Sequence, residues 1–374
     1  MTDRSAPRAA RRARTAVFAS VNAQTDNLGD ILIRREMLAW IGDLAIDLRI
    51  FVGAMPESYL EACRIPAGAR LYRSSVDFQR DLLREALRSR VFLFFAPGPY
   101  FAPPTLSGVG KSFVNLANAT VARMSSGGAV VLGRAYRDLN RPHRLLNRAL
   151  VTHARFACLR DLASSEALGA DVRFEPDLGF GEADRAGGDA AGTRRRYVAF
   201  SLRSGKDEPR GMLEAARDWC AETGLELAFV TQVGRDDERH ARLSRELGGV
   251  HVGWDGAGHA AQLDEVARVY RESALIVSDR LHAVVLGSTC GATPIALKDA
   301  DWDKLPATLQ PVMDLTLLAR DADASTARET LAKARPVRAD IEAAHARLHG
   351  ARAELRALLD PTAAEVAAAE AASP

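Results

Sequence analysis

The stretch from residue 274 to 290, ALIVSDRLHAVVLGSTC, decides the fold of this chain. Its apolar run Ala274–Val277 predicts a buried strand, and Ala283–Cys290 predicts a helix that follows almost at once. Between them lies Ser278-Asp279-Arg280-Leu281-His282. The first backbone N–H groups of a helix have no partner within the helix, so a strand–helix junction of this kind binds anions.

Arg280 and His282 give this junction its chemistry. A guanidinium pairs with phosphate or carboxylate, and an imidazole exchanges protons near neutral pH. We interpret the five residues as an anion site with a proton donor beside it. A plain helix start, with Asp279 as its N-cap and His282 packed or solvated, explains the same residues equally well on the motif alone.

The order of strand and helix repeats along most of the chain and predicts an α/β fold with parallel sheets. Most of the apolar runs are continuous, as in strands that are buried on both faces. The predicted strands are Thr15–Val21, Leu48–Val52, Val91–Phe95, Ala129–Leu132, Phe156–Leu159, Tyr197–Leu202, Leu225–Val230, Ala274–Val277 and Thr293–Leu297. The predicted helices are Ile31–Ile41, Phe78–Arg88, Ser107–Met124, Met212–Glu222, Asp236–Leu247 and Leu263–Glu272.

A glycine- and arginine-rich stretch, Gly181–Arg196, interrupts this order and is interpreted as a linker between two doubly wound domains that face each other across a cleft. An apolar stripe from Ile341 to Leu359 predicts a final helix that packs on the domains. The predicted divisions are a disordered basic tail over 1–14, an N-terminal domain over 15–190, a C-terminal domain over 191–335, and a helix with a frayed tail over 336–374.

Composition excludes several classes of protein. The 374 residues are 47% hydrophobic and 26% charged, with a net charge of +2, which gives no support for an obligatory nucleic-acid partner. The four cysteines form no CxxC pair, so we expect reduced, buried thiols in a cytoplasmic protein and no obligatory metal. The arginine-rich N-terminus lacks an apolar segment after it; disorder and attraction to an anionic membrane are its two interpretations.

Further candidate residues follow other predicted strands, where ligands bind in doubly wound folds. Asn27 and Asp30 follow the first strand and could contact a hydroxylated or anionic ligand, although Asp30 would also serve as a helix cap. Pro97-Gly98-Pro99-Tyr100 predicts a rigid loop that presents an aromatic ring to a sugar; the alternative is a Pro-Gly turn with buried rings.

Three arginines, Arg160, Arg203 and Arg280, each end a predicted strand, so we expect them to converge on one crevice. Such a cluster suits a small anion with several charges. The alternative for Arg160 is a surface ion pair with Asp161, which could also cap the next helix. Lys304 could add a further positive charge or simply be solvated.

These residues, in this order, resemble the polysaccharide pyruvyl transferase family over roughly residues 15–310. The similar segments are Asn27-Leu28-Gly29-Asp30, Arg160-Asp161 with Ser164, Asp177 near Phe180, Ser201-Leu202-Arg203, Ser278 to Ala283, Gly291 with Pro294, and Lys304. The chain departs from the family at Pro97-Gly98-Pro99, which replaces a glycine-rich loop, and at Leu178-Gly179 after Asp177.

The resemblance implies two Rossmann-like domains of the GT-B type and transfer of the enolpyruvyl unit of phosphoenolpyruvate to a sugar as a ketal. It also implies that Arg160, Arg280, the backbone of Leu281, and His282 hold phosphoenolpyruvate. We assign His282 the role of general acid or base. A nucleotide-sugar glycosyltransferase and an inactive sugar-binding scaffold stay open as alternatives. So do a lipid-linked acceptor, which would place the protein at the inner membrane face, and a homo-oligomer.

Overall fold

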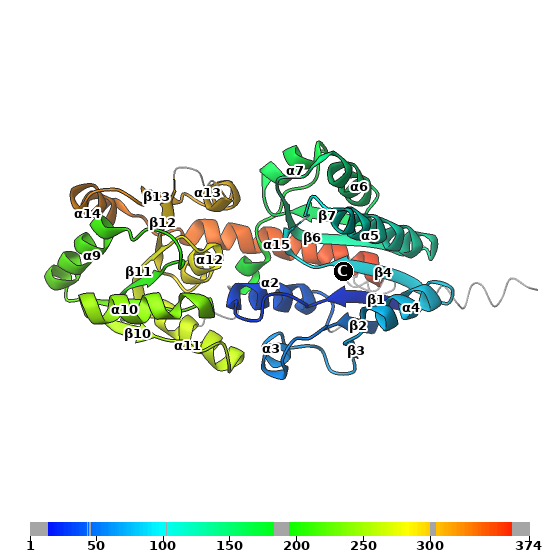
Figure 1. Cartoon of the computed structure of the whole chain (residues 1–374), viewed down its shortest axis with the longest axis horizontal. Coiled ribbons are helices and arrows are strands. Elements are labelled where there is room, and N and C mark those ends of the chain that lie inside the picture. The colour runs from blue at the N-terminus through cyan, green and yellow to red at the C-terminus, as the bar shows by residue number, and fades with distance from the viewer. Residues whose placement is uncertain are drawn as a thin grey trace, which may run out of the picture.

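Figure 1 shows the computed structural model of the chain, which describes residues 14–42, 44, 46–101, 103–182, 194–299 and 304–360. Two parallel β-sheets covered by helices lie side by side, and a long C-terminal helix runs along both. No helix in the described part of the chain is long and apolar enough to cross a bilayer. Three stretches that carry predictions lie outside the described residues: 1–13 of the predicted basic tail (1–14), 183–193 of the predicted linker, and 361–374 at the end of the predicted C-terminal segment (336–374).

The first sheet has the strand order β3-β2-β1-β4-β6-β5, with β7 also paired to β6, and all of its pairings are parallel. Its elements are β1 (Thr15–Ser20), α2 (Leu28–Ala39), β2 (Asp47–Phe51), α3 (Glu57–Ala62), β3 (Arg70–Tyr72), α4 (Ser75–Ala86), β4 (Arg90–Phe95), β5 (Gly98–Tyr100), α5 (Leu106–Met124), β6 (Gly128–Tyr136), α6 (Arg141–Thr152), β7 (Phe156–Leu159), α7 (Leu162–Leu168) and the 3₁₀ helix η1 (Leu178–Glu182).

The second sheet has the order β10-β9-β8-β11-β12-β13 and is also parallel. Its elements are β8 (Tyr197–Ser201), α9 (Arg210–Thr223), β9 (Glu226–Val230), η2 (Gly234–Asp236), α10 (Asp237–Leu247), β10 (Val250–Val252), α11 (His259–Arg271), β11 (Ser273–Ser278), α12 (Leu281–Thr289), β12 (Thr293–Lys298), α13 (Lys304–Leu309), β13 (Thr316–Ala319) and α14 (Ala324–Lys333).

Each sheet has a central point where its winding direction reverses, between β1 and β4 in the first and between β8 and β11 in the second. Loops leave the carboxyl ends of the two central strands in opposite directions at such a point, which opens a crevice there. The prediction of two doubly wound α/β domains is therefore confirmed, and the two crevices face each other.

The nine predicted strands are all present, β7 with the predicted bounds and the others with shifted ends, and four short strands were missed. These four, β3, β5, β10 and β13, are the outermost strands of the two sheets. An edge strand is covered on fewer sides, so its sequence lacks the continuous apolar run that marks a central strand. The central strand β6 shows the contrast, because all nine of its residues are buried.

One apolar core joins the two sheets. It contains Val17 of β1, Ala199 of β8, Val284 of α12 and Leu348 of the last helix, α15 (Arg338–Leu359). The prediction that α15 packs on the domains is confirmed. At its end, the backbone carbonyl of Leu359 accepts a hydrogen bond from Oγ1 of Thr15, at the start of β1, 3.3 Å away.

Candidate functional site

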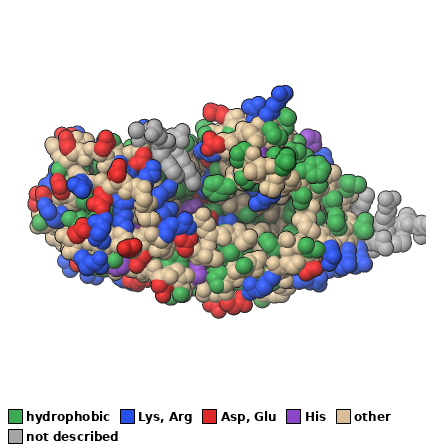
Figure 2. Space-filling model, viewed as in Figure 1, with side chains coloured by type: hydrophobic (Ala, Val, Ile, Leu, Met, Phe, Trp, Pro, Cys, Tyr) green, Lys and Arg blue, Asp and Glu red, His purple; other side chains and the backbone are tan. Residues whose placement is uncertain are grey.

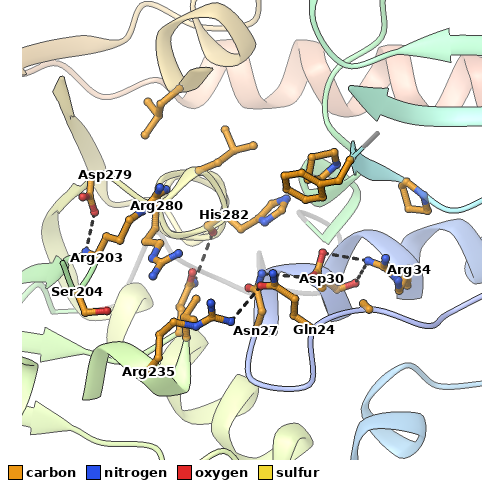
Figure 3. Close-up of a pocket in the computed structure, with 18 of the residues that line it drawn as sticks. Gln24, Asn27, Asp30, Arg34, Arg203, Ser204, Arg235, Asp279, Arg280 and His282 are labelled. Carbon is orange, nitrogen blue, oxygen red and sulfur yellow. Dashed lines mark hydrogen bonds and ion pairs between the residues drawn. The ribbon is translucent and has the colours of Figure 1, made fainter. Parts of the chain in front are cut away.

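The two crevices form one cleft with a volume of about 560 Å³ between the sheets. Strand ends from both units surround it, and Figure 3 shows Arg203, Arg280 and His282 on one side facing Asn27, Asp30 and Arg34 on the other. The lining residues are Ala23, Gln24, Asn27, Asp30, Arg34, Pro97, Pro99, Phe101, Arg160, Arg203, Ser204, Gln232, Val233, Arg235, Asp279, Arg280, Leu281, His282 and Leu305.

Arg160, Arg203 and Arg280 all line this cleft, so the predicted convergence of three strand-end arginines is confirmed. Burial, and then the neighbouring charge of Arg280, lower the pKa of the Arg203 guanidinium. Two guanidinium groups therefore repel each other inside the cleft. An anion bound between them would remove that repulsion.

The start of α12 belongs to the same side of the cleft. Arg280 is the N-cap residue and no side chain caps the helix, so the amides of Leu281 and His282, two residues that line the cleft, have no capping side chain. Ser278 shapes the turn behind them: its Oγ donates to the Ser201 carbonyl (2.6 Å) and accepts from the Arg280 amide (2.9 Å). Ser278 is fully buried and does not line the cleft, unlike the neighbouring Leu281.

Asp279 is not the N-cap of α12, contrary to the alternative considered from the sequence. Its Oδ1 accepts a hydrogen bond from the Arg203 amide (2.9 Å) and its Oδ2 from Arg320 (2.6 Å). The Asp279 carboxylate thus links the residues that follow β8, β11 and β13.

Asp236 holds the side chain of Arg280 in place. Its Oδ2 accepts a hydrogen bond from Nε of Arg280 (2.8 Å), and its Oδ1 accepts one from the Ser204 amide (2.8 Å).

His282 lies in the first turn of α12, where the two units meet. Gly29 of α2 packs against its imidazole so closely that a Cβ atom there would clash with the ring. On another side, Nε2 of His282 lies 3.4 Å from Oδ1 of Asp177. The imidazole is thus held between the units and still lines the cleft.

Asp177 connects His282 to Arg160. Its Oδ2 accepts a hydrogen bond from Nη1 of Arg160 at 2.9 Å, and both side chains are buried, Arg160 with only 1% exposed. Burial on its own would raise the pKa of Asp177, but His282 and then Arg160 outweigh it, and the pKa lies well below its usual range. The surface ion pair considered for Arg160 is wrong. Asp161 instead caps α7, as predicted, and pairs with Arg137.

On the opposite side, the first turns of α2 bring polar groups to the cleft. Asn27, and not Asp30, is the N-cap of α2, because its side chain accepts from the Gly29 amide (3.0 Å). Asp30 lies in the first turn of the helix, where Oδ1 pairs with Arg34 (3.1 Å) and Oδ2 accepts from Nδ2 of Asn27 (3.3 Å). A hydroxyl group in the cleft would meet both a carboxylate and an amide here.

The predicted loop with Gly98 and Tyr100 is the edge strand β5, and its ring is not presented to the cleft. Tyr100 is buried: its hydroxyl lies 2.6 Å from Oγ of Ser112, and the Arg134 guanidinium lies 4.5 Å from its ring centroid. Gly98 has φ +98 and lies close behind Asp30. The exposed aromatic residue beside the cleft is Phe101, one residue further on and 73% exposed.

Several cleft residues were missed by reasoning from the sequence. Arg235 of the second unit donates two hydrogen bonds, of 2.6 and 2.8 Å, to the carboxylate of Asp26 in the first unit. Beside this pair, the Leu28 amide donates to the Gln232 carbonyl (3.0 Å) and the Gly234 amide to the Asp26 carbonyl (2.8 Å). Val233 and Arg235 follow β9, so the rule that ligands bind at strand ends could have found them.

The side chain of Lys304, predicted as an additional positive charge, lies outside the described residues. Among the described residues, no group of three or more His, Cys, Asp or Glu side chains is arranged to hold a metal ion. The four cysteines are buried and free.

Known structures share this architecture. UDP-GlcNAc 2-epimerase from Neisseria meningitidis, bound to UDP-GlcNAc, superposes with a TM-score of 0.55 at 9% identity, over 90% of this chain and 100% of that one. A putative UDP-N-acetylglucosamine 2-epimerase from Listeria monocytogenes gives a TM-score of 0.55 at 13% identity, over 94% and 98%. The fold is thus a two-domain α/β fold of the GT-B type.

The sequence matches the polysaccharide pyruvyl transferase profile over residues 27–298, while no curated protein matches the chain. The chain therefore belongs to the polysaccharide pyruvyl transferase family, a family of transferases, as the resemblance of its strand-end residues implied.

Proposed function

We propose that this protein transfers the enolpyruvyl group of phosphoenolpyruvate to two hydroxyl groups of a sugar in a polysaccharide precursor, forms a ketal and releases phosphate. The observation that carries the proposal is the pair Arg203 and Arg280 at the uncapped start of α12, beside His282. Phosphoenolpyruvate carries a phosphate and a carboxylate, and burying those charges requires guanidinium groups and backbone N–H groups.

The reaction needs a proton at the methylene carbon of the donor. In the proposed reaction His282 delivers this proton, and C2 becomes an oxocarbenium-like centre that one sugar hydroxyl attacks. A second hydroxyl then displaces the phosphate and closes the ketal. Of the two hydroxyl protons, one replaces the proton that the imidazole gave up and the other leaves with the phosphate. General acid–base catalysis of this kind contributes roughly 10²–10⁴-fold in rate.

Each charged group would have a separate task. Arg280, oriented by Asp236, and Arg203 would neutralise the departing phosphate. Arg160, fixed by Asp177, would lie against the carboxylate of the donor. Asp30 faces them from α2 and would accept a hydrogen bond from the attacking sugar hydroxyl.

The proposal is tested by incubating the full chain with phosphoenolpyruvate and a panel of galactosides, glucosides and N-acetylmannosaminides, with phosphate release and ketal formation as readouts. Phosphoenolpyruvate should raise the melting temperature by binding the folded state. Stabilisation by UDP- or GDP-sugars in its place, without phosphate release from phosphoenolpyruvate, would indicate a glycosyltransferase and refute the proposal.

Two variants separate the roles on the two sides of the cleft. His282→Ala should lower kcat by at least about 100-fold while the donor still raises the melting temperature. Asp30→Asn should raise KM for the sugar and leave stabilisation by phosphoenolpyruvate unchanged. Ketal formation at the wild-type rate in His282→Ala would refute the assignment of the acid.

A further inference from the structure

Helix α5 of the first unit buries mainly small residues and leaves several of its large apolar residues exposed, although Leu116 and Val121 pack partly against the core. It buries Gly108, Ser112, Ala119 and Ala122. It exposes Leu106 (93%), Phe113 (61%) and Met124 (82%). An amphipathic helix on the surface of a globular protein has the opposite arrangement. The exposed apolar residues of α5 therefore form a candidate contact surface for a partner outside this chain.

Three of the exposed apolar residues of α5 lie on one line. At 3.6 residues per turn, positions 106, 113, 117 and 124 point in nearly the same direction, and they carry Leu106, Phe113, Ala117 and Met124. Phe101, which lines the cleft, lies shortly before this helix. The stripe therefore begins next to the cleft and extends along the whole of α5.

Positive charge lies beside the stripe. Helix α6 packs against α5 and exposes Arg141, Arg144 and Arg148 on one face, at spacings of three and four residues. None of these three arginines forms an ion pair with another described residue. Between Glu85 and Asp161 the sequence has one acidic residue, Asp138, against eleven lysines and arginines, although the whole chain is nearly balanced.

We propose that this α5–α6 face, the apolar stripe of α5 with the exposed arginines of α6, docks on an anionic lipid bilayer. Figure 2 shows hydrophobic side chains gathered over this lobe, with Lys and Arg side chains at its upper edge. Apolar side chains enter the boundary between headgroups and acyl chains, and arginines pair with lipid phosphates. A protein partner would need acidic groups placed to match each arginine, whereas a bilayer supplies negative charge over its whole surface.

Docking on this face would bring the acceptor side of the cleft, with Asp30 and Phe101, to the membrane surface. A sugar anchored in the bilayer by a lipid could then reach the cleft while the protein stays bound. The docking rests on surface chemistry alone, so its test does not depend on the proposed donor or on catalysis.

The test uses the full chain and sedimentation with vesicles of phosphatidylcholine alone or mixed with phosphatidylglycerol. The wild type should bind the mixed vesicles only, and salt should weaken the binding. Leu106→Ser with Phe113→Ser should lower the partition coefficient by at least about tenfold, because two apolar anchors are lost. Arg144→Glu with Arg148→Glu should lower it by at least about tenfold as well.

Matched controls keep the result specific. Leu71→Ser changes an exposed leucine on β3, at the far edge of the sheet, and Arg210→Glu with Arg245→Glu makes the same change in net charge in the second unit. Both controls should bind like the wild type. All variants should keep wild-type turnover of a soluble sugar acceptor, since none touches the cleft.

Three outcomes would overturn the proposal. The wild type could fail to bind the mixed vesicles, or the face variants could bind as well as the wild type. The third is a homodimer in sedimentation velocity that Leu106→Ser with Phe113→Ser dissociates, without vesicle binding, which would identify the face as a contact between two copies of the chain.

Discussion

A Cβ atom on Gly29 would lie 2.2 Å from Nδ1 of His282, so α2 of one unit leaves room for the imidazole of the other only because residue 29 has no side chain. The two residues are far apart in sequence and belong to facing strand ends. Their contact fixes the ring at the seam of the cleft, and it explains a glycine in the first turn of a helix, where glycine is unfavourable.

Gly29→Ala should therefore inactivate the enzyme without unfolding it. The methyl group must displace the imidazole, and a displacement of about 1 Å costs roughly 100-fold in rate. Steady-state kinetics should show the loss in kcat, with an unchanged circular dichroism spectrum. Gly350→Ala in α15, where an added Cβ meets nothing within 4 Å, is the matched control and should be fully active. Wild-type turnover in Gly29→Ala would mean that the position of the ring is not critical.

Asp177→Asn should lower both stability and kcat. The substitution leaves the Arg160 guanidinium buried without its carboxylate, which costs about 3 kcal/mol in unfolding free energy. It also removes the group beside Nε2 of His282. Urea unfolding and kcat, measured together, check both effects.

The matched control is Glu175→Gln. Glu175 is also buried and pairs with Arg173 and Arg347, which are partly exposed, away from His282. It should lose less stability and keep kcat. If Asp177→Asn were destabilised but turned over like the wild type, Asp177 would have a structural role only.

Asp236→Asn should weaken donor binding. Asp236 orients the Arg280 guanidinium, and a hydrogen bond between charged groups contributes about 1.5–3 kcal/mol. KM for phosphoenolpyruvate should rise at least about tenfold, while KM for the sugar should not change. Asp237→Asn alters a neighbouring carboxylate that contacts Thr231, His251 and the Trp254 amide outside the cleft, and it should leave both constants unchanged. Equal donor KM values in the two variants would contradict this role.

We expect the free energy of unfolding to fall below neutral pH because His240 is buried in its neutral form. Burial lowers the pKa of His240 to about 4, and its Nε2 accepts a hydrogen bond from the Leu202 amide (2.8 Å), which requires the neutral ring. Because the pKa in the folded state is lower than in the unfolded state, the full contribution is present above about pH 6.5. It declines as the pH falls toward 4, because the unfolded state then binds the proton more readily.

Between pH 7 and 5 this effect should cost about 2 kcal/mol of unfolding free energy. His240→Gln keeps an acceptor for Leu202 but cannot titrate, so its stability should fall less over the same interval. Urea unfolding of both proteins at the two pH values measures the difference. Parallel pH dependences would show that other groups cause the decline.

The sequence was sufficient for the central strands and for the residues at their carboxyl ends. Strands buried on both faces have continuous apolar runs, and topology then brings residues such as Arg203 and Arg280 to one edge. The edge strands could not be predicted in this way. Of the two interpretations of the Tyr100 segment, the structure agrees with the buried ring, because β5 pairs with β6 and the Tyr100 hydroxyl meets the buried Ser112.

The partners of the site residues could not be predicted from local sequence either. Asp177 meets His282, and Asp236 meets Arg280, only after distant parts of the chain have packed together. The family resemblance pointed to Asp177, but its contact with the imidazole depends on how η1 lies against α12. Geometry across a domain seam depends on packing, which a local pattern does not encode.

The last helix has a consequence for the order of synthesis. The carbonyl groups of Leu358 and Leu359, at the end of α15, accept hydrogen bonds from Arg90 and Thr15, at the beginnings of β4 and β1. During synthesis, these carbonyl groups leave the ribosome only after both sheets have been made. The first unit thus packs against residues some 340 positions later in the chain. A nascent chain that is stopped after the first sheet would leave the surface that α15 covers exposed to chaperones and proteases.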